Sequence, residues 1–305
     1  PPPVRESPQF WPLFSPRVRD PESIRRQRQG EDGRHRVTSA AAEKSSELTH
    51  VNSFIRYSGR DAEGGFIRAN GDYSFSMEDH PAIVRNARLE KIDFATHGFT
   101  LVKHRTEANF DDPADIERRY YPEACRIVKE LTGASEVFAF LGIRRGGESN
   151  AGGGPALSAH VDFNEAALRG WVARLAPDRA ETLLRKRLVN INLWRPLRPV
   201  ENYPLAVCDA RSVDKSDFMT VRFGEGGQTA SLAETAGGLN VAFNPKHRWY
   251  YYPNMQPDEI LVFRLFDTGD PEWHMTAHTA FEDPTSRPGS PPRESFELRT
   301  VAIFD

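Results

Sequence analysis

The chain is poor in cysteine, in excess charge and in long apolar runs, and each shortage excludes a class of protein. Two cysteines, Cys125 and Cys208, are too few for a disulfide framework, so we expect both to be reduced thiols in a cytoplasmic compartment. A formal net charge of −3 provides no field that would gather nucleic acid or an anionic membrane. No apolar run approaches the ~20 residues of a membrane span.

The N-terminal region lacks the apolar periodicity of the rest of the chain. Residues 1–50 are rich in Pro, Arg, Ser and Glu, so we expect an extended or partly disordered arm, which permits a homodimer by exchange without demanding one. The first residues also lack an apolar signal region, so we expect no secretory address. Order should begin near Val51. We find no internal repeat and no heptad pattern, and residues 51–305 suffice for a single domain with a sizeable core.

The first half of this domain is expected to mix strands with helices. Short apolar runs in residues 88–102, around His97-Gly98, predict a strand, a turn and a second strand. Asp112-Pro113 predicts the start of a helix, and Gly133 predicts its end. The buried face of that helix should comprise Ile116, Tyr120, Ala124, Ile127, Val128 and Leu131. Further on we expect strands over residues 136–143 and 156–163, and a helical region over 164–186 that is interrupted at Pro177.

After residue 186 the pattern is mostly that of β-strands. Segments rich in aromatic and branched residues, separated by turn signals such as Pro253-Asn254, cover residues 188–193, 248–252, 260–266, 277–281 and 296–304. Helices in the first half and many strands in the second favour a mainly β fold with flanking helices, that is, a jelly roll.

The segment Ser158–Phe163 carries two candidate metal ligands. In a strand, residues two apart point to the same face, so His160 and Asp162 could project together into a barrel while Val161 packs on the other side. One imidazole and one carboxylate supply two ligands of a 2-His-1-carboxylate triad, which leaves room on iron(II) for a bidentate 2-oxo acid and for dioxygen. His-x-Asp alone is weak evidence, because it also occurs as an ordinary surface or hydrogen-bonded pair.

A late strand offers the third ligand. A jelly roll brings early and late strands side by side, so His278 can return to the first two ligands. His274 is the rival, but it follows Trp273 in the polar approach to the strand, whereas His278 stands inside the apolar segment Ala277–Phe281.

Fifteen residues beyond His278, the phrase Arg293-x-Ser295 provides the groups that a carboxylate needs. The two side chains share a face if the segment is a strand, Arg offers a bidentate fork, and Ser adds a hydrogen bond. This pair could hold the distal carboxylate of 2-oxoglutarate while the keto acid chelates the metal. A surface ion pair of Arg293 with a residue such as Glu297 is the structural alternative.

Four other residues are candidates for contacts with the substrate or co-substrate. Asn192, Trp194 and Arg195 follow a strand that could line the barrel, or they form a core Trp with flanking polar groups. Arg144 could meet a substrate or co-substrate carboxylate, or form a structural ion pair.

Three further features could contribute to the site. Of the three tyrosines 250–252, at least one hydroxyl should lie near 2-oxoglutarate, and we assign this role to Tyr252, although packing alone would also explain them. Arg299 shares the parity of Arg293 and Ser295 and could support the floor of the site. The glycines 152–154 predict either a mobile rim over the entrance or a plain connector.

Several phrases of the chain also carry a family resemblance. They are His160–Asp162, Asn192–Leu197, Pro204–Asp209, Ala277–Pro284 and Pro292–Arg299, with Tyr120–Glu123 and Thr132–Ala134. From about residue 85 to the C-terminus, the chain resembles the AsaB/CmcJ-type hydroxylase/desaturase family. That family includes fungal gibberellin-desaturase-like proteins, a component of bacterial cephem methoxylation, and aziridine-forming oxygenases of amino-acid metabolism.

The resemblance implies a double-stranded β-helix, a cupin-like jelly roll, with iron(II), 2-oxoglutarate and secondary-metabolite chemistry. His160, Asp162 and His278 match the family's metal positions, and Arg293 and Ser295 match its co-substrate site. One departure concerns the strand before the metal motif, where many members carry His-Thr-x-Arg. The segment Phe140–Arg145 keeps only the arginine, which suggests a different substrate.

We therefore predict an iron(II)/2-oxoglutarate-dependent dioxygenase that oxidises an unactivated C–H bond of a small secondary-metabolite or amino-acid-derived substrate and releases succinate and carbon dioxide. Hydroxylation, desaturation and oxidative ring closure, such as aziridine formation, all stay open. The alternative is a non-oxidative cupin-like metalloenzyme, a zinc lyase or hydrolase, which would not need Arg293 and Ser295. A third possibility, a binding protein that has lost its metal, would not need three intact ligands.

Overall fold

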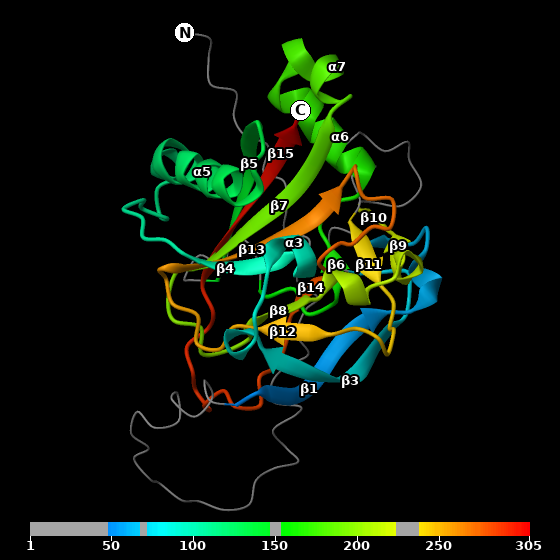
Figure 1. Ribbon diagram of the computed structural model, residues 1–305. Helices are drawn as coiled ribbons and strands as arrows, with labels where there is room; N and C mark the ends of the chain where they lie inside the picture. Colours follow the sequence, from blue (N-terminus) through cyan, green and yellow to red (C-terminus); the bar gives the residue numbers. More distant parts are fainter. Residues whose placement is uncertain (1–47, 68–71, 147–153, 224–237) are drawn as a thin grey trace, which may run out of the picture.

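Two curled β-sheets form the frame of the molecule, which the computed structural model describes for residues 48–67, 72–146, 154–223 and 238–305 (Figure 1). The larger sheet has eight strands, in the spatial order β1 (His50–Ser58), β3 (Met77–Asn86), β12 (Trp249–Tyr251), β8 (Leu205–Cys208), β14 (His278–Ala280), β6 (His160–Val161), β11 (Leu239–Val241) and β9 (Phe218–Thr220). The smaller sheet has five, in the order β4 (Phe99–Lys103), β13 (Glu259–Asp267), β7 (Arg187–Pro196), β15 (Ser295–Phe304) and β5 (Glu136–Arg145). A short parallel pair consists of β2 (Phe66–Ile67) and β10 (Arg222–Phe223).

In both large sheets, strands far apart in the sequence are neighbours, so the predicted mainly β, jelly-roll fold is confirmed. The five strands predicted after residue 186 correspond to β7, β12, β13, β14 and β15. The main apolar core takes side chains from both sheets, such as Val161 and Val207 from the larger and Phe263 and Val301 from the smaller. We call the face of the five-stranded sheet that meets this core its inner face.

The opposite, outer face of the five-stranded sheet is covered by helix α5 (Tyr121–Thr132), which follows the single turn α4 (Pro113–Asp115) and a π-helical turn over Ile116–Tyr120 (Figure 1). The Asp112 side chain accepts a hydrogen bond from the Ala114 amide at 3.0 Å, and Gly133 ends the helix with φ 72°. The predicted start and end of the helix are therefore confirmed. Five of the six predicted stripe residues are buried, and Leu131 is half-buried.

Two local predictions were wrong. Residues 88–102 do not begin with a strand, because the Asp93 side chain accepts from the Thr96 amide at 2.8 Å and Gly98 adopts φ 84°, which together close the short helix α3 (Phe94–His97) before β4. The strand predicted over residues 156–163 is only the two-residue β6, so Asp162 lies just beyond a strand. The helical region after it is confirmed as α6 (Glu165–Leu175) and α7 (Ala180–Leu183), with a turn at Pro177 between them.

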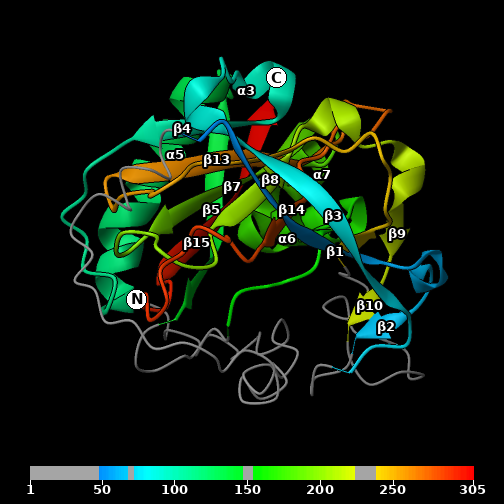
Figure 2. The ribbon, with the colours of Figure 1, turned by 90° about the horizontal axis from the view of Figure 1, so that it is seen from below.

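Strand β1 begins at His50, next to the predicted position Val51, and its long pairing with β3 was not predicted. Figure 2 shows the two strands running side by side. Most of the predicted N-terminal arm, together with Gly152 and Gly153, lies outside the described residues. The division into an arm and one domain therefore stays a prediction. Among the helices that the structure describes, none has the length and apolarity to cross a membrane.

Candidate metal centre

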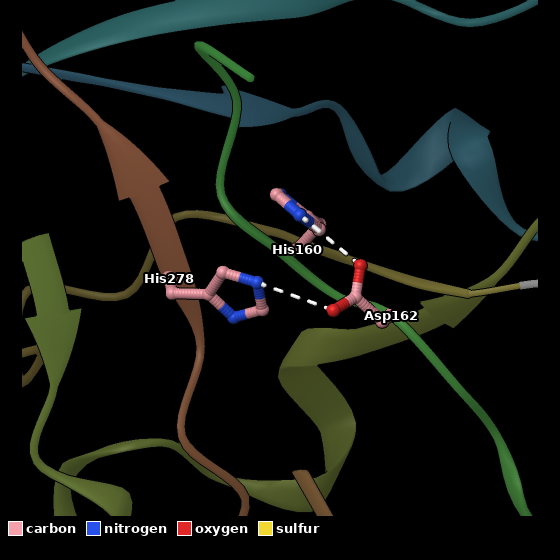
Figure 3. A group of neighbouring side chains, drawn as sticks. All are labelled: His160, Asp162 and His278. Carbon is pink, nitrogen blue, oxygen red and sulfur yellow. Dashed lines mark ion pairs between the residues drawn. The ribbon is translucent and has the colours of Figure 1, made fainter. Parts of the chain in front are cut away.

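Three side chains from distant parts of the chain converge in the core (Figure 3). His160 on β6 and His278 on β14 are directly paired residues of neighbouring strands, and Asp162 follows β6 immediately. One ligand atom from each of the three lies within 4.8 Å of the other two. The Nε2 atom of each imidazole lies 3.7 Å from an oxygen of Asp162. All three residues are buried, so solvent does not compete for these atoms.

These distances suit one shared cation. Two ligand atoms that are each about 2.1 Å from one ion can lie at most about 4.2 Å apart. The 3.7 Å between Nε2 of His160 and Oδ1 of Asp162, and between Nε2 of His278 and Oδ2, satisfies that limit. The other ring nitrogens face away: Nδ1 of His160 lies 2.7 Å from the Ser158 carbonyl oxygen, and Nδ1 of His278 lies 3.4 Å from that of Thr276. An Nδ1–H that donates to a carbonyl leaves the Nε2 lone pair for a metal.

The protonation states also favour a cation. Burial lowers the pKa of His160 to about 4, and burial lowers the pKa of His278 as well, so both imidazoles are neutral near pH 7. Burial alone would raise the pKa of Asp162, but the nearby positive charge of Arg299 is the main influence that holds it well below the usual range. The triad therefore offers two neutral nitrogen donors and one anionic oxygen donor, the set that iron(II) takes in a facial triad.

The Asp162 carboxylate is held from the inner face of the five-stranded sheet. Asn192 on β7 donates from Nδ2 to Oδ2 of Asp162 at 2.7 Å, and an NH2 group of Arg299 on β15 lies 3.0 Å from Oδ1. Asn192 and Arg299 are directly opposite in the register of β7 and β15. Partners of this kind fix the orientation of a ligating carboxylate.

Glu297 is a residue of this network that the sequence analysis considered only as a surface partner of Arg293. It is buried, accepts a hydrogen bond from Asn192 and lies 3.3 Å from Arg299. Burial raises its pKa, although the charge of Arg299 acts in the opposite direction. The alternation of a strand could have identified Glu297, because it lies two residues from both Ser295 and Arg299 and so shares their face.

Arg293 and Ser295 lie close together at the start of β15. The guanidinium of Arg293 lies over the ring of Trp194, 5.2 Å from its centroid, and donates to the Tyr203 carbonyl oxygen at 2.7 Å. The Ser295 Oγ is buried and has no hydrogen-bond partner among the described residues. A buried hydroxyl without a partner is costly unless a ligand satisfies it, so this corner suits a carboxylate.

Three predicted contacts are not brought to this site. Arg144 lies on the outer side of β5, where it donates to the Phe110 carbonyl oxygen at 3.1 Å and pairs with Asp111 and Glu294. Arg195 also points outward, because it follows the inward-facing Trp194 in the strand; its NH2 donates to Nδ1 of His104 at 2.7 Å.

Tyr252 is buried elsewhere in the core, where the guanidinium carbon of Arg88 lies 5.8 Å from its ring centroid. Neither Arg293, Ser295 nor the triad has a described contact with Tyr252. His274, the rival third ligand, is partly exposed and its Nδ1 lies 3.0 Å from Asp270. The structure thus brings His278, rather than His274, to the other two ligands.

Comparison with known proteins agrees with this geometry. A family model described as an oxidoreductase/YMDC permease-like domain matches residues 57–303. Hydroxylase/desaturase efuI of Hormonema carpetanum is 29% identical over 283 residues, which cover 84% of this chain and 95% of the relative. The Fe(II)/2-oxoglutarate-dependent dioxygenase nvfI of Aspergillus novofumigatus is 30% identical over 241 residues, 75% of this chain and 85% of the relative. Hydroxylase/desaturase asaB of Aspergillus flavus is 38% identical over 160 residues, 49% and 69% of the two chains.

Among solved structures, the iron and alpha-ketoglutarate-dependent endoperoxidase NvfI superposes with a TM-score of 0.76 at 26% identity, covering 84% of this chain and 98% of the other. The predicted family resemblance is thus confirmed: the chain belongs to the AsaB-type hydroxylase/desaturase family, which includes Fe(II)/2-oxoglutarate-dependent dioxygenases.

Proposed function

We propose that this chain is an iron(II)/2-oxoglutarate-dependent dioxygenase that oxidises an unactivated C–H bond of a small organic molecule, with His160, Asp162 and His278 as its metal ligands. The observation that carries the proposal is the convergence of two buried imidazole Nε2 atoms and one carboxylate at distances that suit a single ion. Relatives over most of the chain bear the names of such dioxygenases.

The co-substrate would be held by Arg293 and Ser295. Trp194 and the Tyr203 carbonyl fix the guanidinium of Arg293, and the unpartnered Ser295 Oγ can donate to the same carboxylate. When bound, iron and the 2-oxo acid supply the oxidising power, with dioxygen as oxidant and succinate and carbon dioxide as products. The chain itself orients the ligands through Asn192 and Arg299 and keeps bulk water away by burial.

The substrate class is proposed as a secondary metabolite or an amino-acid-derived molecule, turned over in the cytoplasm. Several relatives are named hydroxylase/desaturase, and one solved neighbour is named an endoperoxidase. The cytoplasmic assignment is supported by the two cysteines, both free thiols. Hydroxylation, desaturation and ring closure use the same residues up to the oxidation of the C–H bond, so they are alternatives within this proposal.

The proposal is tested by anaerobic titration of the purified protein with iron(II) and then with 2-oxoglutarate. We expect a weak visible charge-transfer band, which disappears in His278→Ala and shifts to much higher 2-oxoglutarate concentration in Arg293→Ala. His274→Ala is the matched control, because this histidine lies four residues away in the sequence and binds Asp270 instead. A folded wild-type protein that binds zinc but shows no band with iron(II) and 2-oxoglutarate would favour a non-oxidative metalloenzyme.

A further inference from the structure

A second arginine lies beside the proposed co-substrate site, and no role has been assigned to it so far. Arg145, the last residue of β5, is 5% exposed. It stands directly opposite Ser295 in the register of β5 and β15, so its side chain emerges on the same inner face as the Ser295 hydroxyl. Its neighbour Arg144 points to the outer side, where Asp111 and Glu294 neutralise it. The strand thus presents one of its two adjacent arginines to the site.

The backbone geometry places the end of β5 directly against Arg293. Gly146 has φ 78°, and a Cβ at this position would lie 2.1 Å from the carbonyl oxygen of Arg293. Only glycine permits this close approach of the two backbones. Arg145, Arg293 and Ser295 therefore come from backbone segments in contact with one another.

The negative charge of Glu297 acts on both Arg145 and Arg293, but Glu297 is already paired with Arg299. Arg299 is the guanidinium that pairs with Asp162 and Glu297, at 3.0 Å and 3.3 Å. In the described part of the chain, Arg293 has no carboxylate within 4.0 Å. Burial and the nearby positive charge of Arg145 lower the pKa of Arg293 to about 9. The two buried guanidinium groups are therefore close enough to repel each other. Such a pair is stabilised by an anion placed between its members.

We propose that Arg145 is a second guanidinium of the site for the distal carboxylate of the 2-oxo acid, and that Arg145 and Arg293 together set the preference for a 2-oxo diacid over a 2-oxo monoacid. The inference rests on the proposed function. It extends that function because one bidentate arginine suffices to bind a carboxylate, whereas two make its presence a strong requirement.

The test compares two co-substrates of equal chain length. 2-Oxoglutarate carries the distal carboxylate, and 2-oxopentanoate has a methyl group in its place. Both are titrated anaerobically into the iron(II)-loaded protein, and the charge-transfer band gives each dissociation constant. In Arg145→Gln we expect 2-oxoglutarate to bind at least about tenfold more weakly, because a charge-assisted hydrogen bond is lost, while 2-oxopentanoate changes less than about twofold. In Arg144→Gln, the matched control, both constants should stay within about twofold of the wild type.

The outcomes separate this inference from the proposed function. A wild-type protein without a band for either acid contradicts the proposed function before any variant is compared. A wild-type band with the same diacid preference in Arg145→Gln overturns the inference alone, as does an equal weakening of both acids. Unchanged binding of 2-oxopentanoate also reports that the variant is folded. If Arg145→Gln does not fold, Arg145→Lys replaces it: a charge without the fork should retain part of the diacid preference, and full retention would contradict the bidentate role.

Discussion

The two faces of the five-stranded sheet differ in how far the protein itself satisfies their buried polar groups. On the outer face, the buried Arg195 directs its donors to His104, to the Pro257 carbonyl oxygen and to the Tyr120 hydroxyl in the π-helical turn before α5. On the inner face, more buried polar atoms have no partner among the described residues: Ser295 Oγ, Oδ1 of Asn190 and of Asn192, and Nε and one NH group of Arg299. On the outer side the same holds for Nε of Arg144 and one oxygen of Glu123. A buried polar group with all its partners stabilises the fold, whereas one left without them indicates where a ligand belongs.

The comparison is sharpest within single strands. Trp194 and Arg195 are adjacent on β7, and Arg144 and Arg145 are adjacent on β5, yet each pair is divided between the two faces. On β5, two arginines therefore face opposite sides of the sheet because of strand alternation alone. Substitutions on the outer face should consequently lower stability, whereas substitutions on the inner face should lower ligand affinity.

The largest expected effect is on the metal. His160→Ala removes one of three ligands, so we expect the affinity for iron(II) to fall by more than about a hundredfold, since loss of a mere partner of a ligand already costs about 10- to 100-fold. His104→Ala, on the outer face, should leave the affinity unchanged. Anaerobic calorimetry measures both. Comparable losses in the two variants would break the distinction between the faces.

The next largest expected effect is a loss of stability from a substitution on the outer face. Arg195→Met would leave acceptors such as His104 Nδ1 and the Pro257 carbonyl without their donor, at about 1–3 kcal/mol each. We expect the free energy of unfolding to fall by about 2–4 kcal/mol, while the affinities for iron(II) and 2-oxoglutarate stay unchanged. Urea unfolding and ligand titration measure the two quantities. A loss of 2-oxoglutarate affinity at full stability would mean that Arg195 reaches the site after all.

A smaller effect distinguishes two buried asparagines on the inner face of β7. Asn192 donates to Asp162 at 2.7 Å, whereas Asn190 donates to the Thr300 carbonyl oxygen at 2.8 Å. Asn192→Ala should therefore lower the iron(II) affinity by about tenfold, because the ligating carboxylate loses its orientation. Asn190→Ala should lower stability only. Equal iron(II) affinities in both variants would mean that Asn192 does not support the metal centre.

The smallest expected effect is a pH dependence of stability from the outer face. Burial, and then the charge of Arg195, lowers the pKa of His104 from its ordinary value of 6.5. Between the folded-state pKa and pH 6.5 the unfolded chain binds more protons, so this histidine's contribution is present above pH 6.5 and is lost as the pH falls through that window. His104→Asn keeps an acceptor for Arg195 without titrating, so its stability should decline less between pH 7 and pH 5. Parallel profiles for both proteins would contradict this assignment.

Sequence patterns predicted those features that depend on few residues. The helix ends at Asp112 and Gly133 follow from local capping, and the convergence of His278 with His160 followed from the order of strands in a jelly roll. For Arg144 the sequence left open a ligand contact or a structural ion pair, and the structure shows ion pairs with Asp111 and Glu294. Pairing in the sheet decides this, because Arg145, and not Arg144, lies opposite Ser295. Asp93 and Gly98 closed a helical turn where apolar alternation indicated a strand, and the cap was the stronger signal. Tyr252 was assigned without any spacing that tied it to Arg293.

The central claim is that His160, Asp162 and His278 bind one iron ion together. A crystal structure of protein grown anaerobically with iron(II) and 2-oxoglutarate, with anomalous data at the iron edge, tests it most directly. We expect one anomalous peak about 2.0–2.2 Å from both Nε2 atoms and from a carboxylate oxygen of Asp162. A peak elsewhere, or none at this position in protein that binds iron in solution, would contradict the claim.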